Sequence, residues 1–577
     1  MLSFFRAAAT IAVVLGLSSG GHAIGKVTRS GRYLYNADGS RFYIKGIAYQ
    51  EQGKSSSANV GKESGRATIQ LGAATVDPNA PFSEPSTFID PLANATACAR
   101  DIPLLQQLGV NSIRVYSVNA SLNHDSCMQG LSSAGIYTIL DLTLPVNGSI
   151  DRSSPAWTTN LLDSYINTID AFSKYDNVLA YNVGNEVVVS PNGTTAATFV
   201  KAAARDTKAY LTSKSSSALV GYAAIDGDDT WIVPLANYLS CDPSGGNSGG
   251  TAIDIFGLNN YEFCGDSTFQ ASYAGKTGDF AGYNVVAYFS EYGCNQPSPR
   301  VWAEVPVLFG SDAVPVWSGG VAFSYFPAES GQGEFGMVTL SSDGSTVTPN
   351  TDFDNLKTMY NQVSFINDPG QSSAPSASYP ACPQQNTSFL ASTALPPTPS
   401  DSACQCLESN LSCQFNPQTS NTSAIVGSLL DTACSLLGTV GGSCDPIAGN
   451  GQTGQYGTVS SCDPSTKLSF AMSEYFEANK RDPQACSFSG NGTVNAKASS
   501  SSNATVVASS CLASATGTHV PTAPSSATNP GSSSSGSSSS SSTPGAATTI
   551  LVSDTRALLG VFLMFAVSVA GGLLSLA

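Results

Sequence analysis

The sequence predicts an α/β fold, a (β/α)8 TIM barrel followed by a small disulfide-rich module. From Phe42 to Phe326, short β-branched and aromatic runs alternate with helical or loop segments, giving eight strands. This alternation is typical of a parallel sheet, and eight units over roughly 330 residues indicate a closed barrel. Eight further cysteines gather between Cys404 and Cys511, the density of a module held by disulfides.

The elements of the barrel follow from local patterns. Asp38-Gly39 predicts a hairpin turn between two extended arms near the start. Strands are expected at Phe42–Ala48, Asn111–Tyr116, Gly135–Leu144, Val178–Glu186, Leu219–Asp226, Ile253–Phe263, Val285–Glu291 and Gly320–Phe326. Helices are expected at Ala97–Leu108, Cys127–Ser133, Ala156–Tyr175 and Ala196–Ser213, where the apolar residues have helical spacing. Gly109 is typical of a helix end.

Two of these strands stop at a glutamate, Glu186 after the fourth and Glu291 after the seventh. Carboxylates at strand ends lie at the mouth of an α/β barrel, where such barrels place their chemistry. A glycosidase needs two: one protonates the leaving oxygen, and the other attacks the sugar or activates water. Either glutamate alone could be an ordinary loop residue. Together, with Asn185 before Glu186 and Ser-Glu-Tyr-Gly around Glu291, they predict a glycosidase.

Composition narrows the classes of partner. Only 11% of the residues are charged, and Lys+Arg 25 against Asp+Glu 41 gives a net charge of −16. Nucleic-acid binding is excluded because it needs a basic surface, whereas a weakly charged acidic surface suits a neutral polymer. With three histidines and an even count of 14 cysteines, we expect disulfides and neither a metal site nor a cofactor.

Both ends of the chain predict secretion. Residues 1–23 contain Arg6, an apolar stretch and a small-residue cleavage site after Ala23, as in a signal peptide. The apolar segment Ala557–Ala577 has no charged residue after it. It could be a membrane span or a GPI-attachment signal. The missing basic flank and the small residues beginning at Gly545 favour attachment of a GPI anchor at about Gly545.

The chain therefore divides into six parts. They are a signal peptide (1–23), the barrel (24–366), a Pro/Ser-rich linker (367–402), the cysteine-rich module (403–512), a Ser-rich stalk with O-glycans (513–545) and a GPI-attachment propeptide (546–577). N-glycans are expected at the sequons Asn94, Asn119, Asn147, Asn192, Asn386, Asn410, Asn421, Asn491 and Asn503. Eight cysteines in the module allow 105 pairings. Its aromatic residues could stack on sugar rings or form its core: Tyr456, Phe470, Tyr475 and Phe476.

Several segments together resemble one known family. The chain is similar to the fungal GPI-anchored β-1,3-glucanosyltransferases of glycoside hydrolase family 72, and the cysteine-rich segment resembles the family 43 carbohydrate-binding module found in one branch of that family. The similar segments cover most of the barrel motifs: Phe42–Gln50, Asn111–Val118, Tyr181–Val188, Ile255–Gly265, Phe289–Asn295 and Trp317–Val338. The resemblance extends over nearly the whole mature chain.

The resemblance implies a (β/α)8 barrel and a retaining double displacement. It gives Glu186 the role of acid/base, Glu291 that of nucleophile, and Asn185 that of binding the sugar 2-hydroxyl. Arg114 and Tyr261 would keep the nucleophile ionised and oriented. Further cleft residues that it implies are Gln50, Tyr116, Asp141 and Tyr325, and the implied disulfides are Cys98–Cys127, Cys241–Cys382 and Cys264–Cys294. Phe323 departs from the family, which has Tyr there, so one hydrogen bond to sugar is in doubt.

Some alternatives stay open at this level. Arg114 could pair with another carboxylate, and Tyr116, Tyr261 and Tyr325 could simply pack at the barrel rim. We expect an enzyme that cleaves β-1,3-glucan and transfers the new reducing end to another glucan, with Tyr116 and Tyr325 near the acceptor. Hydrolysis, or a non-catalytic glucan-binding protein of the cell wall, are the alternatives. The outer face of the cell membrane and the wall are the expected location.

Overall fold

The computed structural model describes residues 24–52, 68–70, 87–142, 150–330, 333–501, 503–515 and 517–524. The predicted signal peptide, the sequon at Asn147, most of the stalk and Gly545 lie outside these residues. Within them, none of the helices combines the length and the apolar character that a membrane crossing requires.

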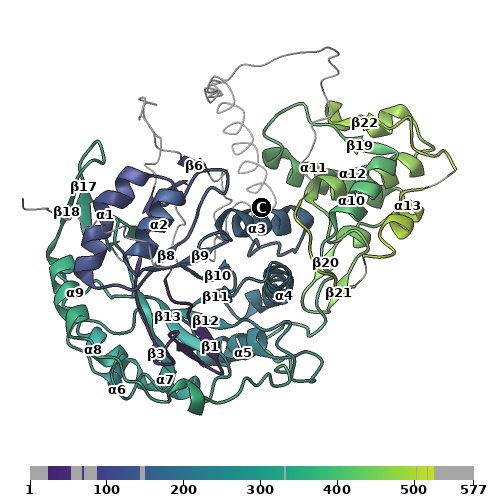
Figure 1. The fold of residues 1–577 in the computed structure, drawn as a ribbon. Coiled ribbons are helices and arrows are strands. Elements are labelled where there is room, and N and C mark those ends of the chain that lie inside the picture. The colour runs from purple at the N-terminus through teal and green to yellow at the C-terminus, as the bar shows by residue number, and fades with distance from the viewer. Residues whose placement is uncertain are drawn as a thin grey trace, which may run out of the picture. The chain divides into compact units, whose positions relative to one another are not determined.

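Eight parallel strands close into a barrel, as predicted (Figure 1). In order around the barrel they are β4 (Ile44–Ala48), β8 (Ser112–Val115), β9 (Tyr137–Asp141), β10 (Val178–Asn185), β11 (Leu219–Ile225), β12 (Ile255–Asn259), β13 (Val286–Tyr292) and β14 (Trp317–Ala322). Glu186 follows the fourth strand and Glu291 lies near the end of the seventh, so both predicted placements are confirmed. The eighth strand begins three residues earlier than predicted and ends at Ala322.

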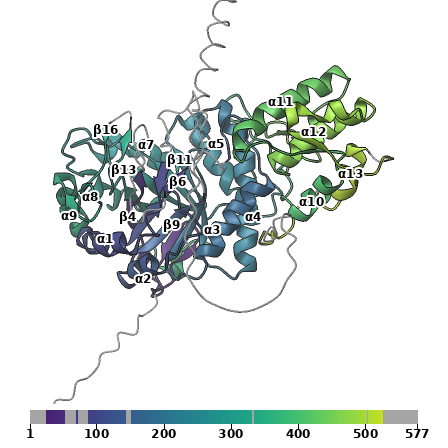
Figure 2. The same cartoon turned by 90° about the horizontal axis from the view of Figure 1, so that it is seen from above.

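Helices surround the strands on the outside (Figures 1 and 2). They are α1 (Ala95–Leu108), α2 (Asp125–Ser133), α3 (Thr159–Phe172), α4 (Ala197–Ser213), α5 (Asp229–Ser240), α6 (Phe269–Ser272), α7 (Ala274–Asp279), α8 (Glu304–Leu308) and α9 (Thr351–Gln362). The four predicted helices are present, and Gly109 ends α1 in the left-handed conformation at φ 71°. The pattern missed α5, whose mainly apolar run contains Pro234, α6 to α8, which are too short to show a period, and α9, whose sequence is mainly polar.

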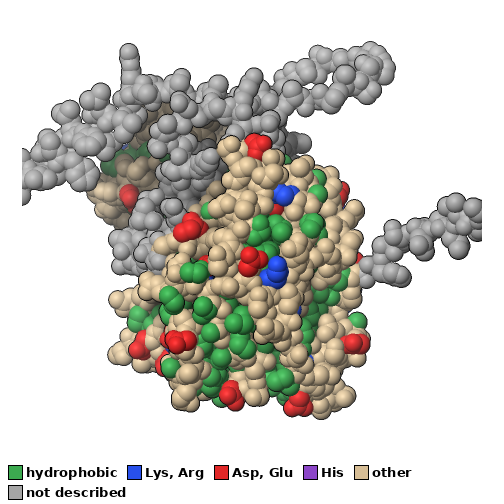
Figure 3. Space-filling model, turned by 90° about the vertical axis from the view of Figure 1, so that its left-hand side faces the viewer, with side chains coloured by type: hydrophobic (Ala, Val, Ile, Leu, Met, Phe, Trp, Pro, Cys, Tyr) green, Lys and Arg blue, Asp and Glu red, His purple; other side chains and the backbone are tan. Residues whose placement is uncertain are grey.

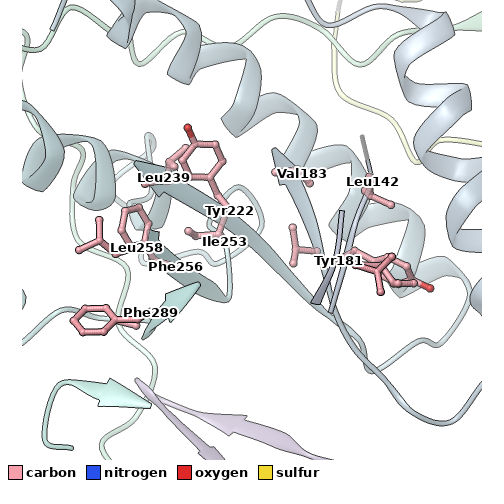
Figure 4. Packing of buried hydrophobic residues seen from close by; sticks show 14 of the residues in the cluster. Leu142, Tyr181, Val183, Tyr222, Leu239, Ile253, Phe256, Leu258 and Phe289 are labelled. Atoms are coloured by element: carbon pink, nitrogen blue, oxygen red, sulfur yellow. The ribbon is translucent and has the colours of Figure 1, made fainter. Parts of the chain in front are cut away.

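Alternation along the strands separates two apolar layers. Figure 4 shows side chains of the outer layer, among them Val183 of β10, Tyr222 of β11 and Phe256 of β12, which pack under the helices. Ala180 of β10 and Ile255 of β12 belong to a second cluster. Successive side chains of a strand point to opposite faces, one toward the helices and one into the barrel. Near the strand ends, side chains that point into the barrel include the polar residues Asn182, Asn185 and Asn259.

Shorter strands flank the barrel. The expected hairpin is confirmed, since β2 (Tyr33–Tyr35) and β3 (Arg41–Phe42) pair antiparallel across the Asp38-Gly39 turn. The remaining short strands are β1 (Thr28–Ser30), β5 (Glu51–Gln52), β6 (Thr68–Gln70), β7 (Thr87–Ile89), β15 (Glu329–Ser330), β16 (Gly333–Glu334), β17 (Val338–Leu340) and β18 (Val347–Pro349). None of them joins the closed sheet.

Residues 367–402, predicted as a linker, lie against the barrel. Tyr35 Oη donates to the carbonyl of Pro369 over 3.0 Å, and Thr398 Oγ1 donates to Asp206 of α4 over 2.7 Å. The disulfide Cys241–Cys382 ties the middle of the segment to the end of α5. The segment therefore connects the two modules without being a free tether. The other implied pairs, Cys98–Cys127 and Cys264–Cys294, are also joined.

The cysteine-rich module is mainly helical. It contains α10 (Asp401–Asn410), α11 (Ser423–Thr439), α12 (Pro464–Ala478), α13 (Ala504–Cys511) and the paired strands β19 (Cys413–Phe415) with β22 (Gly492–Val494) and β20 (Gly449–Asn450) with β21 (Gln455–Tyr456). Its disulfides are Cys404–Cys462, Cys406–Cys511, Cys413–Cys486 and Cys434–Cys444. These pairs link α10, α11 and α13 to other parts of the module.

The module's aromatic residues have different roles. Phe470 and Phe476 are buried in its core. Tyr456 packs edge-on against Phe199 of α4 and donates its hydroxyl to Ala394. Tyr475 is half-buried, as Tyr456 is, and its ring packs edge-to-face against Phe488.

Reduction should unfold the cysteine-rich module before the barrel. The module's apolar core is small, and loss of a native disulfide from such a domain typically costs about 2–5 kcal/mol. Mass spectrometry of alkylated cysteines under increasing dithiothreitol should therefore detect Cys413 and Cys486 before Cys98 and Cys127. Simultaneous labelling of both pairs, with loss of barrel structure at the same point, would contradict this order.

Candidate active site

An extra residue near the end of β10 sets the direction of the side chains that follow. Asn182 pairs with Gly221 of β11 but Asn185 pairs with Ala223, so β10 takes three steps where β11 takes two. A bulge of this kind re-aims side chains and is frequent beside active sites. It directs Asn185 into the barrel mouth, where Asn185 Oδ1 accepts a hydrogen bond from Arg114.

β13 contains a similar irregularity. Gly257 of β12 pairs with Tyr288, but Asn259 pairs with Glu291, so β13 has one residue more than β12 over this stretch. The extra residue interrupts the alternation of side chains. As a result, Ser290 meets the side chain of Asn259, with Ser290 Oγ donating to Asn259 Oδ1 over 2.7 Å, while Glu291 also reaches the mouth.

Three donors surround the carboxylate of Glu291. Tyr116 donates its hydroxyl to Oε1 over 2.8 Å, Tyr261 donates to Oε2 over 2.9 Å, and Arg114 Nη1 lies 3.2 Å from Oε1. Burial raises the pKa of Glu291, while Arg114 and the two hydroxyls act in the opposite direction. Burial also raises the pKa of both tyrosines well above the usual range, so they stay protonated donors.

Arg114 joins the residues of this mouth. It is completely buried, and its guanidinium pairs with Asp141 through Nε at 3.2 Å and Nη2 at 2.7 Å. Nη2 also donates to Asn185 Oδ1 over 2.8 Å. Asp141 accepts a further bond of 2.6 Å from Asn182. Arg114 therefore pairs with two carboxylates, Asp141 and Glu291, and its remaining bonds go to Asn185, Asn259 and the carbonyl of Ser290.

Glu186 is held by backbone and side-chain contacts. Its φ of 49° is unusual for a residue other than glycine, and such strain is found where surrounding structure enforces it. The backbone N–H donates to Ala223 over 2.8 Å, and the carbonyl accepts from Arg152 Nε over 2.7 Å. The side chain is 2% exposed, and its Oε1 accepts a 2.7 Å bond from Asn259 Nδ2.

Two of the predicted site residues, Gln50 and Tyr325, make hydrogen bonds to other groups than Glu186 and Glu291. Gln50 Oε1 accepts from the backbone N–H groups of Tyr116 and Ser117, which joins the ends of β4 and β8. Tyr325 is fully buried, and its hydroxyl donates to Asp101 of α1 over 3.0 Å. That contact does not support the expectation that Tyr325 binds an acceptor sugar, because its polar group is directed at a helix of the outer layer.

Phe323, the departure from the family, lies among the rings of this mouth. It is half-buried and packs edge-to-face against Tyr116 and Tyr261, with centroids 6.4 and 6.3 Å apart. These are the two tyrosines that bind Glu291. Phe323 therefore supplies an apolar wall there, without a hydroxyl of its own.

Sequence reasoning missed three site residues: Asn182, Asn259 and Ser290. Each is a polar residue inside a buried apolar strand, and a buried polar side chain needs a partner. That signal was present in the sequence, but the partners lie on other strands. Among the described residues, no cluster of three or more His, Cys, Asp or Glu side chains is arranged to hold a metal ion.

The two carboxyl groups therefore have different surroundings. Glu291 faces a cation and two hydroxyl donors, which favour its ionised form. Glu186 faces the neutral amide of Asn259. Two carboxyl groups whose environments differ in this way are suited to separate roles, one as a nucleophile and the other as an acid and base.

Removing either tyrosine hydroxyl that donates to Glu291 should shift the acid limb of the pH–activity profile. In Tyr116→Phe or Tyr261→Phe, loss of a donor raises the pKa of the carboxylate, so the acid limb of kcat/KM should move up by about one pH unit. The measurement is the pH profile on a laminarioligosaccharide. Tyr283→Phe, which loses a bond to Ala236 away from the mouth, is the matched control. An unmoved limb in both site variants would contradict the assigned contacts.

Comparison with known proteins agrees with this geometry. The family model described as glucanosyltransferase matches residues 21–364, and the model described as X8 domain matches residues 411–493. Protein EPD1 of Candida maltosa is 39% identical over 483 residues, covering 83% of this chain and 79% of the relative. The 1,3-beta-glucanosyltransferase gas1 of Schizosaccharomyces pombe is 37% identical over 511 residues, covering 88% and 84%.

Solved structures give the same result. The apostructure of a mutant of Saccharomyces cerevisiae Gas2p superposes with a TM-score of 0.71 at 32% identity, covering 86% of this chain and 98% of that one. The Gas2p complex with laminaritetraose and laminaripentaose has a TM-score of 0.69 at 32% identity, covering 85% and 98%. With the family model spanning the barrel and these relatives alike over most of the chain, this protein belongs to the glucanosyltransferase family, glycoside hydrolase family 72.

Proposed function

We propose that this protein is a retaining β-1,3-glucanosyltransferase that elongates cell-wall glucan. It cleaves a β-1,3-glucan internally and transfers the new reducing end to the non-reducing end of another glucan. The observation that carries the proposal is the Glu291 carboxylate, which is bound by Arg114, Tyr116 and Tyr261 beside Glu186 at the mouth of a family 72 barrel.

In the first step, Glu291 attacks the anomeric carbon while Glu186 gives its proton to the glycosidic oxygen. The bond from carbon to the leaving oxygen breaks, one glucan departs as the neutral alcohol, and the other stays bonded to Glu291. Arg114, Tyr116 and Tyr261 hold the attacking oxygen atoms in place. Asn185, beside the acid, is the proposed partner of the sugar 2-hydroxyl.

In the second step, Glu186 is a carboxylate and takes a proton from the acceptor hydroxyl. That oxygen attacks the anomeric carbon, and the bond to Glu291 breaks, so the configuration of the sugar is retained. Water would give hydrolysis by the same route. A bound acceptor outcompetes water because positioning can supply effective molarities of about 10⁵ M or more.

Donor and acceptor are both proposed to be β-1,3-glucan chains. Relatives from Schizosaccharomyces pombe, Arthroderma benhamiae and Candida albicans are named 1,3-beta-glucanosyltransferases, and the Gas2p complex contains laminaritetraose and laminaripentaose. The surface agrees with a neutral substrate, since charged side chains are sparse on the face shown in Figure 3. The cysteine-rich module, matched as an X8 domain, is proposed to help retain the polymer.

The proposed location is the outer face of the cell membrane and the cell wall. A signal peptide ending at Ala23, a GPI anchor near Gly545, and N- and O-glycans complete this proposal. Its support within the described residues is the set of disulfides, which are typical of oxidising compartments. It is also supported by the exposure of sequon asparagines such as Asn192 and Asn386.

A defined donor tests the proposed reaction. With a reduced laminarioligosaccharide, the wild type should form products longer than the donor, because sugar competes with water for the intermediate. Glu186→Gln and Glu291→Gln should each abolish turnover, since general acid–base catalysis alone contributes roughly 10²–10⁴-fold. Chromatography of products over time is the measurement.

The outcomes of this experiment separate the candidate functions. Only shorter products would identify a hydrolase, and no products would identify a binding protein. Wild-type turnover by either variant, with an unchanged melting temperature, would remove that glutamate from the mechanism. Glu262→Gln, an exposed glutamate on the loop after β12, is the matched control and should keep its activity.

The anchor is tested by the chemistry of its release. A phosphatidylinositol-specific phospholipase C should release the mature protein from membranes, because only lipid would hold it there. Mass spectrometry of the released protein should find no peptide from residues 557–577. Recovery of that peptide from the membrane-bound mature protein would instead identify a membrane span.

A further inference from the structure

Asn259 is a buried amide whose four hydrogen bonds all lie within the catalytic mouth. It is the last residue of β12 and is 2% exposed. Its Oδ1 accepts from Ser290 Oγ over 2.7 Å and from Arg114 Nη1 over 3.4 Å. Its Nδ2 donates to Glu186 Oε1 over 2.7 Å and to Asn185 Oδ1 over 3.3 Å.

Arg114 determines which way the amide faces. A guanidinium can only donate, so the atom of Asn259 that faces it must be the oxygen. The same reasoning applies to Asn185, whose Oδ1 accepts from Arg114 Nη2 over 2.8 Å. Asn259 Nδ2 then faces two acceptors, Asn185 Oδ1 and Glu186 Oε1. The donor to Glu186 is therefore set by the same cation that binds Glu291.

The space for this arrangement comes from the neighbouring strand. Gly257 precedes Asn259 on the inward face of β12, and a Cβ there would lie 2.5 Å from Ser290 Oγ. The extra residue in β13 places Ser290 at this point. A glycine and a bulge on adjacent strands thus hold the hydroxyl that supports the amide oxygen.

We propose that Asn259 is a positioning residue for the acid/base Glu186, a role that rests on the proposed function. Its N–H holds Oε1 as an acceptor, so the proton that Glu186 delivers is carried by Oε2. The same bond favours the carboxylate over the acid, which lets Glu186 act as a base in the second step. Asn259 also fixes the position of Glu186 relative to Glu291, because it bonds both Arg114 and Ser290.

Other charged and titratable groups also act on Glu186 from the elements around it. Its carbonyl accepts from Arg152, and Tyr222 of β11 and Tyr261 after β12 interact with its charge. The further charged groups of the mouth are Arg114 of β8, Asp141 of β9 and Glu291 of β13. Of these six, Arg114 also contacts Asn259, but over 3.4 Å, and its shorter bonds to Asp141, Asn185 and Glu291 do not involve that amide. A shift in the pH profile of an Asn259 variant therefore reports mainly the 2.7 Å contact with Glu186.

The test is Asn259→Ala in the full-length protein. Loss of a hydrogen bond to a charged group should lower kcat/KM on a laminarioligosaccharide by about 10- to 100-fold. The carboxyl group should then stay protonated to higher pH, so the alkaline limb of kcat/KM should rise by about one pH unit. On a 2,4-dinitrophenyl β-laminaribioside, whose leaving group needs no proton, kcat/KM of Asn259→Ala should fall much less.

Asn260→Ala is the matched control. The neighbouring amide is equally buried but donates to Asp226 and Glu262, so the alkaline limb should not move. Ser290→Ala leaves the Asn259 Nδ2 donor in place but removes the hydrogen bond to Asn259 Oδ1. It should move the alkaline limb in the same direction as Asn259→Ala, but by a smaller amount. Thermal unfolding of each variant checks the fold, and Ser290→Ala supplies the answer if Asn259→Ala is unstable.

Two results would overturn the inference: an unmoved alkaline limb in both site variants, or equal losses on the natural and the activated donor. The second would mean that Asn259 supports the barrel generally. Failure of the underlying function is distinguishable, because Glu186→Gln would then retain turnover. If Glu186→Gln is inactive and Asn259→Ala keeps the wild-type pH profile, the acid/base assignment stands and the positioning role is wrong.

Discussion

The organisation of the catalytic mouth depends on one buried cation. Arg114 is completely removed from solvent, and a charge in that position is stable only when it is paired and hydrogen-bonded. Its donors reach Asp141 on β9, Asn185 on β10 and Glu291 on β13. The requirement to satisfy one guanidinium therefore aligns three strands. Arg114 binds Glu291 directly and is connected to Glu186 through Asn259.

The backbone cooperates through irregularities at the two strands that carry the glutamates. Both β10 and β13 have one residue more than a neighbouring strand just before the mouth. Regular alternation would send every second side chain to the helices, so the bulges let consecutive residues, Ser290 and Glu291, both serve the site. The rigid frame for this comes from the apolar layer under the helices, to which Phe256 and Phe289 belong.

The loops at the mouth are also restrained. Cys264–Cys294 joins the segment after Tyr261 to the segment after Glu291, so the donor and the carboxylate that it binds are tied by a covalent bond close to both. Gln50 holds the end of β8, where Tyr116 begins its approach to Glu291. A site whose supporting residues are themselves restrained keeps its geometry through catalysis.

The sequence by itself determined the barrel, its strand order and the strand ends that carry Glu186 and Glu291, because periodicity and turn residues are local signals. It also indicated which residues gather around Glu291. Only the tertiary structure showed how Asn182, Asn259 and Ser290 join them, that Tyr325 donates to Asp101, and how the module's eight cysteines pair. Those facts depend on strand register and on contacts between distant segments. A one-residue shift in register changes which side chains share a face, and no local pattern records it.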